Sequence, residues 1–239
     1  MPEADRPHDV RRDSFAAMLD RLQASAEFTT DLLGHHQGSP TFALTFDDGS
    51  EDHLWVGRAL AGRGLHGVFF LVAGLIGEPG FLTWDQAREL VALGHEVGSH
   101  SVDHLPVRSL SRDEILHQVR ASKQQLEDEL QVPVRYFAPP YGYDAPGLRE
   151  SLVACGYQAS RLTRWGLYRP DRGTPWRQPS IPLTEFTVTA GWPDQILAGG
   201  RMPAAMRVTR LGRAILPEPL RALARRGLGS TGRGRRSDG

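Results

Sequence analysis

Two adjacent carboxylates and a pair of histidines are the residues of this 239-residue chain whose types and spacing best suit catalysis. Asp47 and Asp48 follow the apolar stretch 41–46, and His100 and His104 stand four residues apart in the segment HSVDH. An aspartate with two histidines offers three ligands to a divalent metal ion and leaves coordination positions open, as a hydrolytic site requires. The sequence therefore predicts a metal site with hydrolytic chemistry.

The two carboxylates are expected to have different roles. Successive side chains of an extended strand diverge, so one carboxylate can bind the metal while the other accepts a proton from water. Each motif alone has a simpler explanation, because Asp-Asp-Gly can cap a helix or shape a turn and a histidine pair at this spacing often arises by chance. Only the combination favours a metal-dependent hydrolase.

The segments that would position these residues alternate between strand and helix. Capping boxes formed by Thr83 with Gln86 and by Ser111 with Glu114 mark two helix starts. The alternation predicts a parallel α/β sheet or barrel, in which functional side chains gather at the carboxyl ends of strands. Strands are expected at 41–46, 68–72, 95–99 and 134–138, and helices at 52–62, at 84–93, from 111 to 130, and from a cap at Asp144 to Cys155.

The two ends of the chain differ from this central part. We expect domains at 1–40 (an N-terminal helix near 14–22 and a polar connector), 41–200 (the catalytic domain) and 201–239 (a basic tail). A strand is expected at 185–190 and a helical turn at 193–197. From Met206 onward nine Arg stand against Glu218 and Asp238, so the tail could contact an acidic membrane surface or be disordered.

Composition sets outer limits on function. The 28 basic and 28 acidic residues balance, which removes a global-charge argument for nucleic-acid binding. Cys155 is the only cysteine, so no internal disulfide can form. Residues 1–13 show no secretory signal, and the apolar run 67–77 is shorter than the roughly 18 residues of a membrane span. We expect a cytoplasmic or membrane-peripheral protein, or a true start upstream of Met1.

Three segments in order resemble the motifs of a known family, the NodB-homology polysaccharide deacetylases: TFDDG at 45–49, HSVDH at 100–104 and FAPPYG at 137–142. The resemblance implies a single deformed (β/α) barrel and metal-dependent removal of acetyl groups from N-acetylated sugars, a hydrolysis of non-peptide carbon–nitrogen bonds. It implies that Asp47 is the general base, that Asp48, His100 and His104 bind the metal, and that the Tyr141 backbone N–H binds the oxyanion. Zinc suits these ligands, and cobalt or iron would also fit.

Two departures from the family pattern qualify this assignment. The family commonly has an arginine before the proline of the third motif, where it orients the base, and this chain has Ala138. The Phe-Ala that precedes the prolines of this motif resembles the pattern of the poly-N-acetylglucosamine deacetylase-like subgroup. The late Leu-x-His that supplies the proton donor is also absent, since no histidine follows His117. Upstream candidates for this donor are His8, the first choice, then His35 and His36, with His53 after them.

Two alternatives to an efficient deacetylase stay open from the sequence. One is a catalytically weakened homologue that binds metal and carbohydrate. The other is a metal-dependent amidohydrolase that acts on a small amide other than a sugar, because the site chemistry would be the same.

Overall fold

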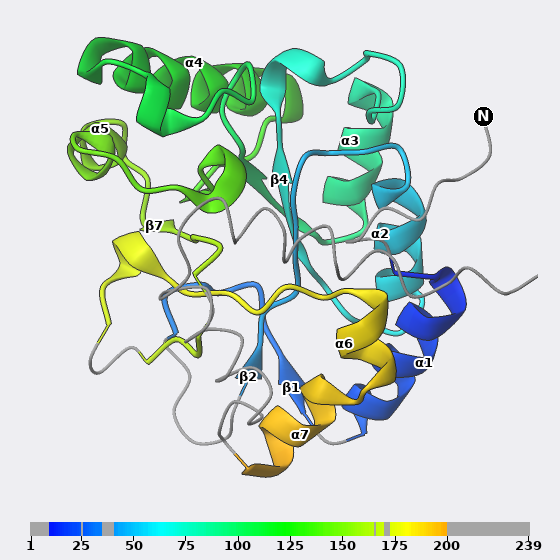
Figure 1. Cartoon of the computed structure of the whole chain (residues 1–239). Coiled ribbons are helices and arrows are strands. Elements are labelled where there is room, and N and C mark those ends of the chain that lie inside the picture. The colour runs from blue at the N-terminus through cyan, green and yellow to red at the C-terminus, as the bar shows by residue number, and fades with distance from the viewer. Residues whose placement is uncertain (1–9, 25, 35–40, 165, 170–172, 200–239) are drawn as a thin grey trace, which may run out of the picture. The chain divides into compact units, whose positions relative to one another are not determined.

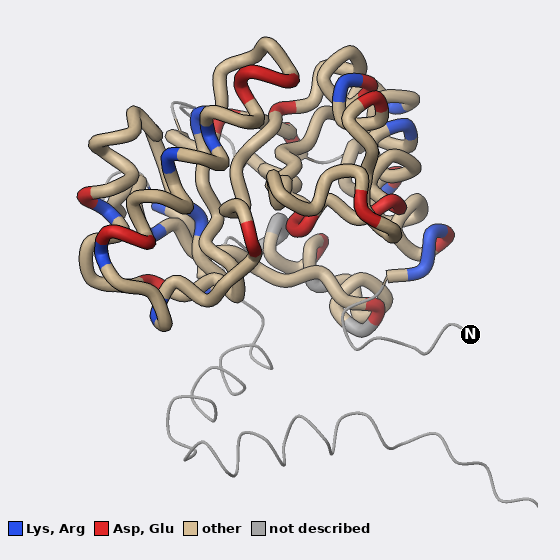
Figure 2. The backbone as a smooth tube through the Cα atoms, turned by 90° about the horizontal axis from the view of Figure 1, so that it is seen from above, with Lys and Arg blue, Asp and Glu red and all other residues tan. Residues whose placement is uncertain are grey.

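The computed structural model describes residues 10–24, 26–34, 41–164, 166–169 and 173–199. His8, His35, His36 and the basic tail lie outside the described residues. Contacts divide the chain into two compact units, one drawn from 1–21 and 183–239 and the other spanning Leu22–Pro182. Figure 2 shows basic and acidic positions interspersed along the described backbone, in keeping with the balanced composition.

A five-stranded parallel sheet forms the centre of the larger unit (Figure 1). Its strands pair in chain order, and the helices α2, α3, α4 and α5 connect them, so the carboxyl ends of all five strands meet at one edge. The strands are β3 (Thr45–Phe46), β4 (Val68–Leu71), β5 (Glu96–Ser99), β6 (Tyr136–Phe137) and β7 (Ala159–Ser160).

The helices of this unit begin and end close to the predicted positions. Both predicted capping boxes are present, and they start α3 and α4. The apolar residues that recur along α4 are buried, including Ile115 and Val119. Asp144 does not cap α5, because the helix begins after Gly147, whose φ of 88° only glycine adopts easily. The helices are α2 (His53–Ala61), α3 (Trp84–Ala92), α4 (Arg112–Leu130) and α5 (Leu148–Ala154), with short 3-10 turns η1 (Ala73–Leu75), η2 (Val107–Ser109), η3 (Pro140–Gly142) and η4 (Pro175–Arg177).

The stretch predicted as one strand at 41–46 is divided between two sheets. β2 (Thr41–Phe42) pairs with β1 (Glu27–Phe28), which lies within the predicted polar connector. A two-residue strand carries too little alternation to be recognised from sequence. Leu32, which follows β1, packs in the same core cluster as Val68 and Phe70 of β4, and this tertiary contact fixes the segment.

The smaller unit contains α1 (Arg12–Gln23, whose last two residues fall in the larger unit), α6 (Glu185–Thr189) and α7 (Trp192–Gly199). The predicted strand at 185–190 is wrong, because the segment is helical. The Thr184 hydroxyl accepts from the Thr187 N–H and stabilises the first turn of α6. The Glu185 carboxylate accepts hydrogen bonds from Ser14 and Arg11 of the same unit. The predicted helical turn at 193–197 lies in α7, and no helix of the described residues is long and apolar enough to span a membrane.

Candidate active site

The predicted ligands converge at the carboxyl edge of the sheet. Asp48 follows β3 and His100 follows β5, with His104 in the loop beyond. Asp48 Oδ1 lies 3.3 Å from His100 Nε2 and 3.1 Å from His104 Nε2. One ligand atom from each residue lies within 4.8 Å of the others, as three ligands of a single ion require.

The orientation of His100 fits metal binding. Its ring is almost fully buried, and Nδ1 lies 2.6 Å from the Ala138 carbonyl oxygen. A carbonyl can only accept, so Nδ1 carries the proton and Nε2 keeps its lone pair toward Asp48. The two imidazoles of His100 and His104 beside it hold the pKa of Asp48 far below its ordinary value. The donor set and its tautomer therefore fit a divalent metal.

Gln118 of α4 holds the loop that carries His104. Its Oε1 accepts from the backbone N–H of Val102 at 3.0 Å and of Asp103 at 3.2 Å. Its Nε2 donates to Asp103 Oδ2 at 2.7 Å. The Asp103 carboxylate is therefore bonded to Gln118. Asp103 thus anchors the loop to the helix.

Unusual backbone conformations are concentrated at this site. Of the five described residues other than glycine with positive φ, four are Asp48, Ser101, His104 and Tyr141, with φ of 80°, 70°, 55° and 60°. Such conformations cost free energy and persist where the surrounding structure enforces them, often at functional sites. The His104 N–H donates to the Ser101 hydroxyl at 3.2 Å, which closes the turn that brings the second histidine toward Asp48.

The other carboxylate, Asp47, forms an ion pair with Arg161. Removal from water would raise the pKa of Asp47, but the Arg161 charge and the nearby His100 outweigh this and lower it. Asp47 is therefore an ionised carboxylate at neutral pH, available to accept a proton. About a third of its side chain is exposed, 31%, whereas Arg161 is 7% exposed.

Arg161 is the functional residue that the sequence analysis missed. Phe137 of β6 is the register partner of Ser160 of β7, so Arg161 stands across from Ala138 on the neighbouring strand. Paired residues on adjacent strands present side chains to the same face. The position directly after β6, where the family commonly has an arginine, is occupied by Ala138. In this chain the arginine, Arg161, stands directly after β7 instead.

Tyr141 occupies a tight turn after β6. Its carbonyl accepts from the Thr163 hydroxyl at 3.1 Å, and the Gly142 N–H donates to the Pro139 carbonyl at 2.8 Å. Glycine is required at 142, because φ is 66° and a Cβ would lie 2.0 Å from Thr163 Oγ1. The peptide plane between Tyr141 and Gly142 is therefore fixed. The role of its N–H in binding an oxyanion stays a prediction.

His53, the last of the candidate proton donors, is partly buried at the start of α2. Its ring packs edge-on to Phe46 at 5.9 Å and Phe69 at 5.7 Å, and its buried Nδ1 has no hydrogen-bond partner. Burial lowers the pKa of His53 to about 4. A neutral imidazole in this place does not suit a proton donor at neutral pH.

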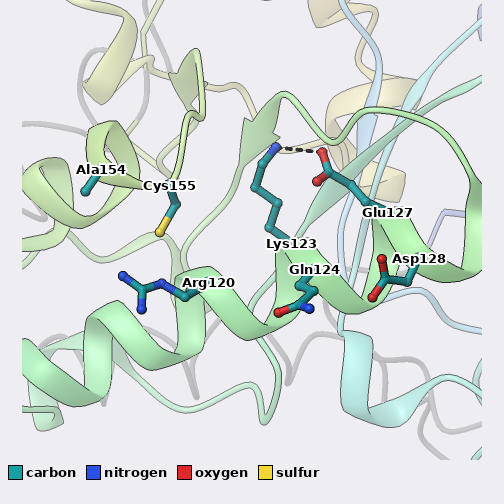
Figure 3. A pocket seen from close by; sticks show the side chains of 7 residues that line it. All are labelled: Arg120, Lys123, Gln124, Glu127, Asp128, Ala154 and Cys155. Carbon is teal, nitrogen blue, oxygen red and sulfur yellow. Dashed lines mark hydrogen bonds and ion pairs between the residues drawn. The ribbon is translucent and has the colours of Figure 1, made fainter.

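A shallow hollow of about 190 Å³ lies elsewhere, between α4 and the end of α5 (Figure 3). The ammonium of Lys123, one of its basic groups, is 2.8 Å from the Glu127 carboxylate. Cys155 lines it and is partly buried. None of the predicted catalytic or metal-binding residues lines this hollow.

An aspartate and two histidines beside an arginine-paired carboxylate, at the carboxyl edge of a parallel α/β sheet, form a candidate metal site. Residues 34–160, more than half of the chain, match the family model for polysaccharide deacetylase. The chain belongs to the polysaccharide deacetylase family, as the three motifs predicted.

Individual relatives agree with this assignment. The peptidoglycan-N-acetylglucosamine deacetylase PgdA of Listeria monocytogenes is 33% identical over 42% of this chain, and the match covers 21% of that longer protein. The Streptococcus pyogenes deacetylase PplD, solved with acetate, gives a TM-score of 0.72 at 20% identity over 77% of this chain and 87% of its own. IcaB from Ammonifex degensii gives a TM-score of 0.67 at 27% identity, over 77% of this chain and 91% of its own. The predicted deformed (β/α) barrel is confirmed.

Proposed function

We propose that this protein is a metal-dependent hydrolase that removes acetyl groups from N-acetylated sugars of a polysaccharide or glycan precursor. The observation that carries the proposal is the convergence of Asp48, His100 and His104 beside the arginine-paired Asp47. Membership of the polysaccharide deacetylase family supports the carbohydrate substrate.

Each group at the site has a distinct task in amide hydrolysis. Asp48, His100 and His104 would hold a divalent metal, which supplies a Lewis acid and lowers the pKa of water. Zinc is the first expectation for two imidazoles and a carboxylate. Asp47, kept ionised and oriented by Arg161, accepts the proton of the attacking water. The Tyr141 N–H, in its fixed turn, donates to the oxygen that becomes negative as the acetyl carbonyl is attacked.

A weakened, carbohydrate-binding homologue is the second candidate. The observation that favours it concerns two histidines outside the candidate ligand set, neither of which suits a proton donor: His53 has a depressed pKa, and both ring nitrogens of His95 are hydrogen-bonded, to the Gly57 carbonyl and the Gly67 N–H. Such a protein would bind metal and glycan and release acetate slowly.

Acetate release from chitooligosaccharides, measured after chelation and after metal is added back, tests the proposal. We expect activity only with metal, and a His100→Ala, His104→Ala double variant that neither retains stoichiometric metal nor turns over. Cleavage of small amides in place of glycans would favour an amidohydrolase. Undiminished activity in the fully chelated protein would contradict metal dependence.

A further inference from the structure

Large apolar side chains are exposed beside the metal ligands. Leu105, Tyr141 and Tyr143 are 44%, 53% and 37% exposed, and they are three of the five large hydrophobic residues that are exposed in the described chain. All three follow β5 or β6, in the loops that also carry His104 and the third motif. Scattered apolar residues on a surface need no explanation, but a cluster next to a catalytic site marks a surface that a ligand covers.

The rings in this cluster form a row that leads away from the metal ligands. The His104 and Tyr141 ring centroids are 5.0 Å apart, and those of Tyr141 and Tyr143 are 6.0 Å apart with 23° between the planes. The guanidinium carbon of Arg108 lies 4.2 Å from the centre of the Tyr143 ring. The row therefore extends beyond the space that one sugar at the metal would fill, and it ends at a positive charge.

The charge of Arg108 is fixed in place and not neutralised within the described chain. Its Nε donates to the Asp144 backbone carbonyl at 3.4 Å, and the Asp144 carboxylate pairs with Arg177 instead. The other arginine of this edge, Arg161, pairs with Asp47. Stacking on Tyr143 holds the Arg108 guanidinium in place, and among the described residues its two terminal nitrogens form no ion pair. A planar guanidinium in this state suits two-point binding of a carboxylate.

We propose that Leu105, Tyr141, Tyr143 and Arg108 form a subsite for the sugar next to the one that is deacetylated, and that Arg108 selects a neighbour carrying a carboxylate. The inference rests on the proposed function, because the sugar that reacts must lie at Asp47 and the metal ligands. It adds a substrate class: a glycan in which an acidic sugar follows the N-acetylated one. The apolar side chains contact the ring, and the guanidinium binds the acidic group.

The test compares two tetrasaccharides of equal length by calorimetric binding in the Asp47→Asn background, where turnover does not interfere. One alternates N-acetylglucosamine with glucuronate, and the other contains only N-acetylglucosamine. We expect the acidic glycan to bind more tightly, and Arg108→Gln to weaken it about tenfold, as loss of a hydrogen-bonded charge pair does, with less than a twofold effect on the neutral one. The preference should decrease as salt is raised, because the contact is exposed.

Three further variants give the comparison its controls. Arg120→Gln removes the same charge from the exposed arginine that lines the hollow of Figure 3 and should leave both affinities unchanged. Tyr143→Ala should weaken both glycans and remove the acidic preference, whereas Tyr143→Phe should retain it.

The outcomes separate this inference from the proposed function. Equal effects of Arg108→Gln on the two glycans, or none on either, would overturn the inference even if acetate is released by the unmodified protein. A charge-dependent preference without acetate release would support the subsite and contradict the deacetylase. Failure of both glycans to bind would overturn the subsite.

Discussion

Arg161, the residue after β7, pairs with Asp47 and lies across from Ala138, the residue after β6. The contact shows how an active-site charge can be retained while its position in the sequence changes. In a parallel pair, side chains at register positions lie together, so an arginine on either strand can meet the same carboxylate. The small side chain of Ala138, directly after β6, leaves room for the Arg161 side chain. Its backbone carbonyl still orients His100. The departure at Ala138 therefore does not remove the arginine from the site.

Asp47→Asn should lower deacetylation by about a hundredfold or more, because an amide cannot serve as the general base. Metal should remain bound, since Asp47 is not one of the three ligands. Steady-state rates and elemental analysis of the purified variant measure both effects. Asp48→Asn is the comparison and should lose metal. If Asp47→Asn lost metal and Asp48→Asn kept it, the two roles would be exchanged.

Arg161→Gln should lower kcat by about tenfold or more while metal stoichiometry is unchanged, because Asp47 loses the partner that orients it. A double-mutant cycle with Asp47→Asn gives the decisive measurement, since two residues that act as one unit are not additive. In the Asp47→Asn background, Arg161→Gln should have little further effect on kcat. Full additivity would mean that Arg161 acts on the reaction independently of Asp47.

Gln118 links α4 to the metal-binding loop by three hydrogen bonds. Gln118→Leu should weaken metal binding by about tenfold or more, as loss of a group that orients metal ligands typically does. Competition with a chelator measures the affinity. Gln124→Leu, an exposed change on the same helix, is the matched control. Equal metal affinity in the two variants would show that the loop is held without Gln118.

His53 at the start of α2 should make the stability of the fold depend on pH. Its folded pKa of about 4 is below the ordinary 6.5, so the unfolded chain binds a proton in this interval that the folded chain excludes. Stability is fully present above about pH 6.5 and decreases as the pH falls toward 4, by at most about 3 kcal/mol at 1.36 kcal/mol per unit.

Urea unfolding between pH 7 and 4 measures this slope, and His53→Phe should reduce it because phenylalanine packs with Phe46 and Phe69 without titrating. His95, whose pKa is also lowered by burial, accounts for part of the slope that remains. An unchanged slope in His53→Phe would assign the effect to other groups.

Local signals in the sequence were sufficient for the elements that carry them in full. The helices α3 and α4 have capping boxes and long apolar periodicity, and both formed as predicted. Elements decided by distant contacts were not predictable in this way. β1 has two residues. α6 has threonines and a valine that suit a strand, but its first residue, Glu185, accepts hydrogen bonds from the distant Arg11 and Ser14.

The same distinction between local signals and distant contacts applies to the residues of the candidate site. Asp48, His100 and His104 could be found because each lies in a recognisable segment at a strand end. Arg161 could not, because its relation to Asp47 depends on the register of β6 and β7, which no local pattern records. The burial of His53 against Phe46 and Phe69 likewise follows from the packing of α2 on the sheet.

The complete chain has nine histidines, and their distribution determines what chemistry the whole molecule can perform. His100 and His104 are candidate ligands, His95 is buried, His53 is partly buried, and His66 and His117 are exposed. A proton for the departing amine must therefore come from His8, His35 or His36, which lie outside the described residues, from a group other than histidine, or from solvent. This requirement affects an amide, whose amine leaves only after protonation, far more than an ester with an acidic alcohol.

We predict that 4-nitrophenyl acetate is cleaved at least about a hundredfold faster than the acetamide of chitotetraose, since a positioned acid contributes about a hundred- to ten-thousandfold where the leaving group needs it. Both reactions should require metal and both should slow in Asp47→Asn, because the ester must be attacked at the same site. The variants His8→Ala, His35→Ala and His36→Ala should leave both rates unchanged. A selective loss of amide hydrolysis in one of them would instead identify that histidine as the donor, and its acidic limb should then disappear from the pH profile for the amide while the profile for the ester stays the same.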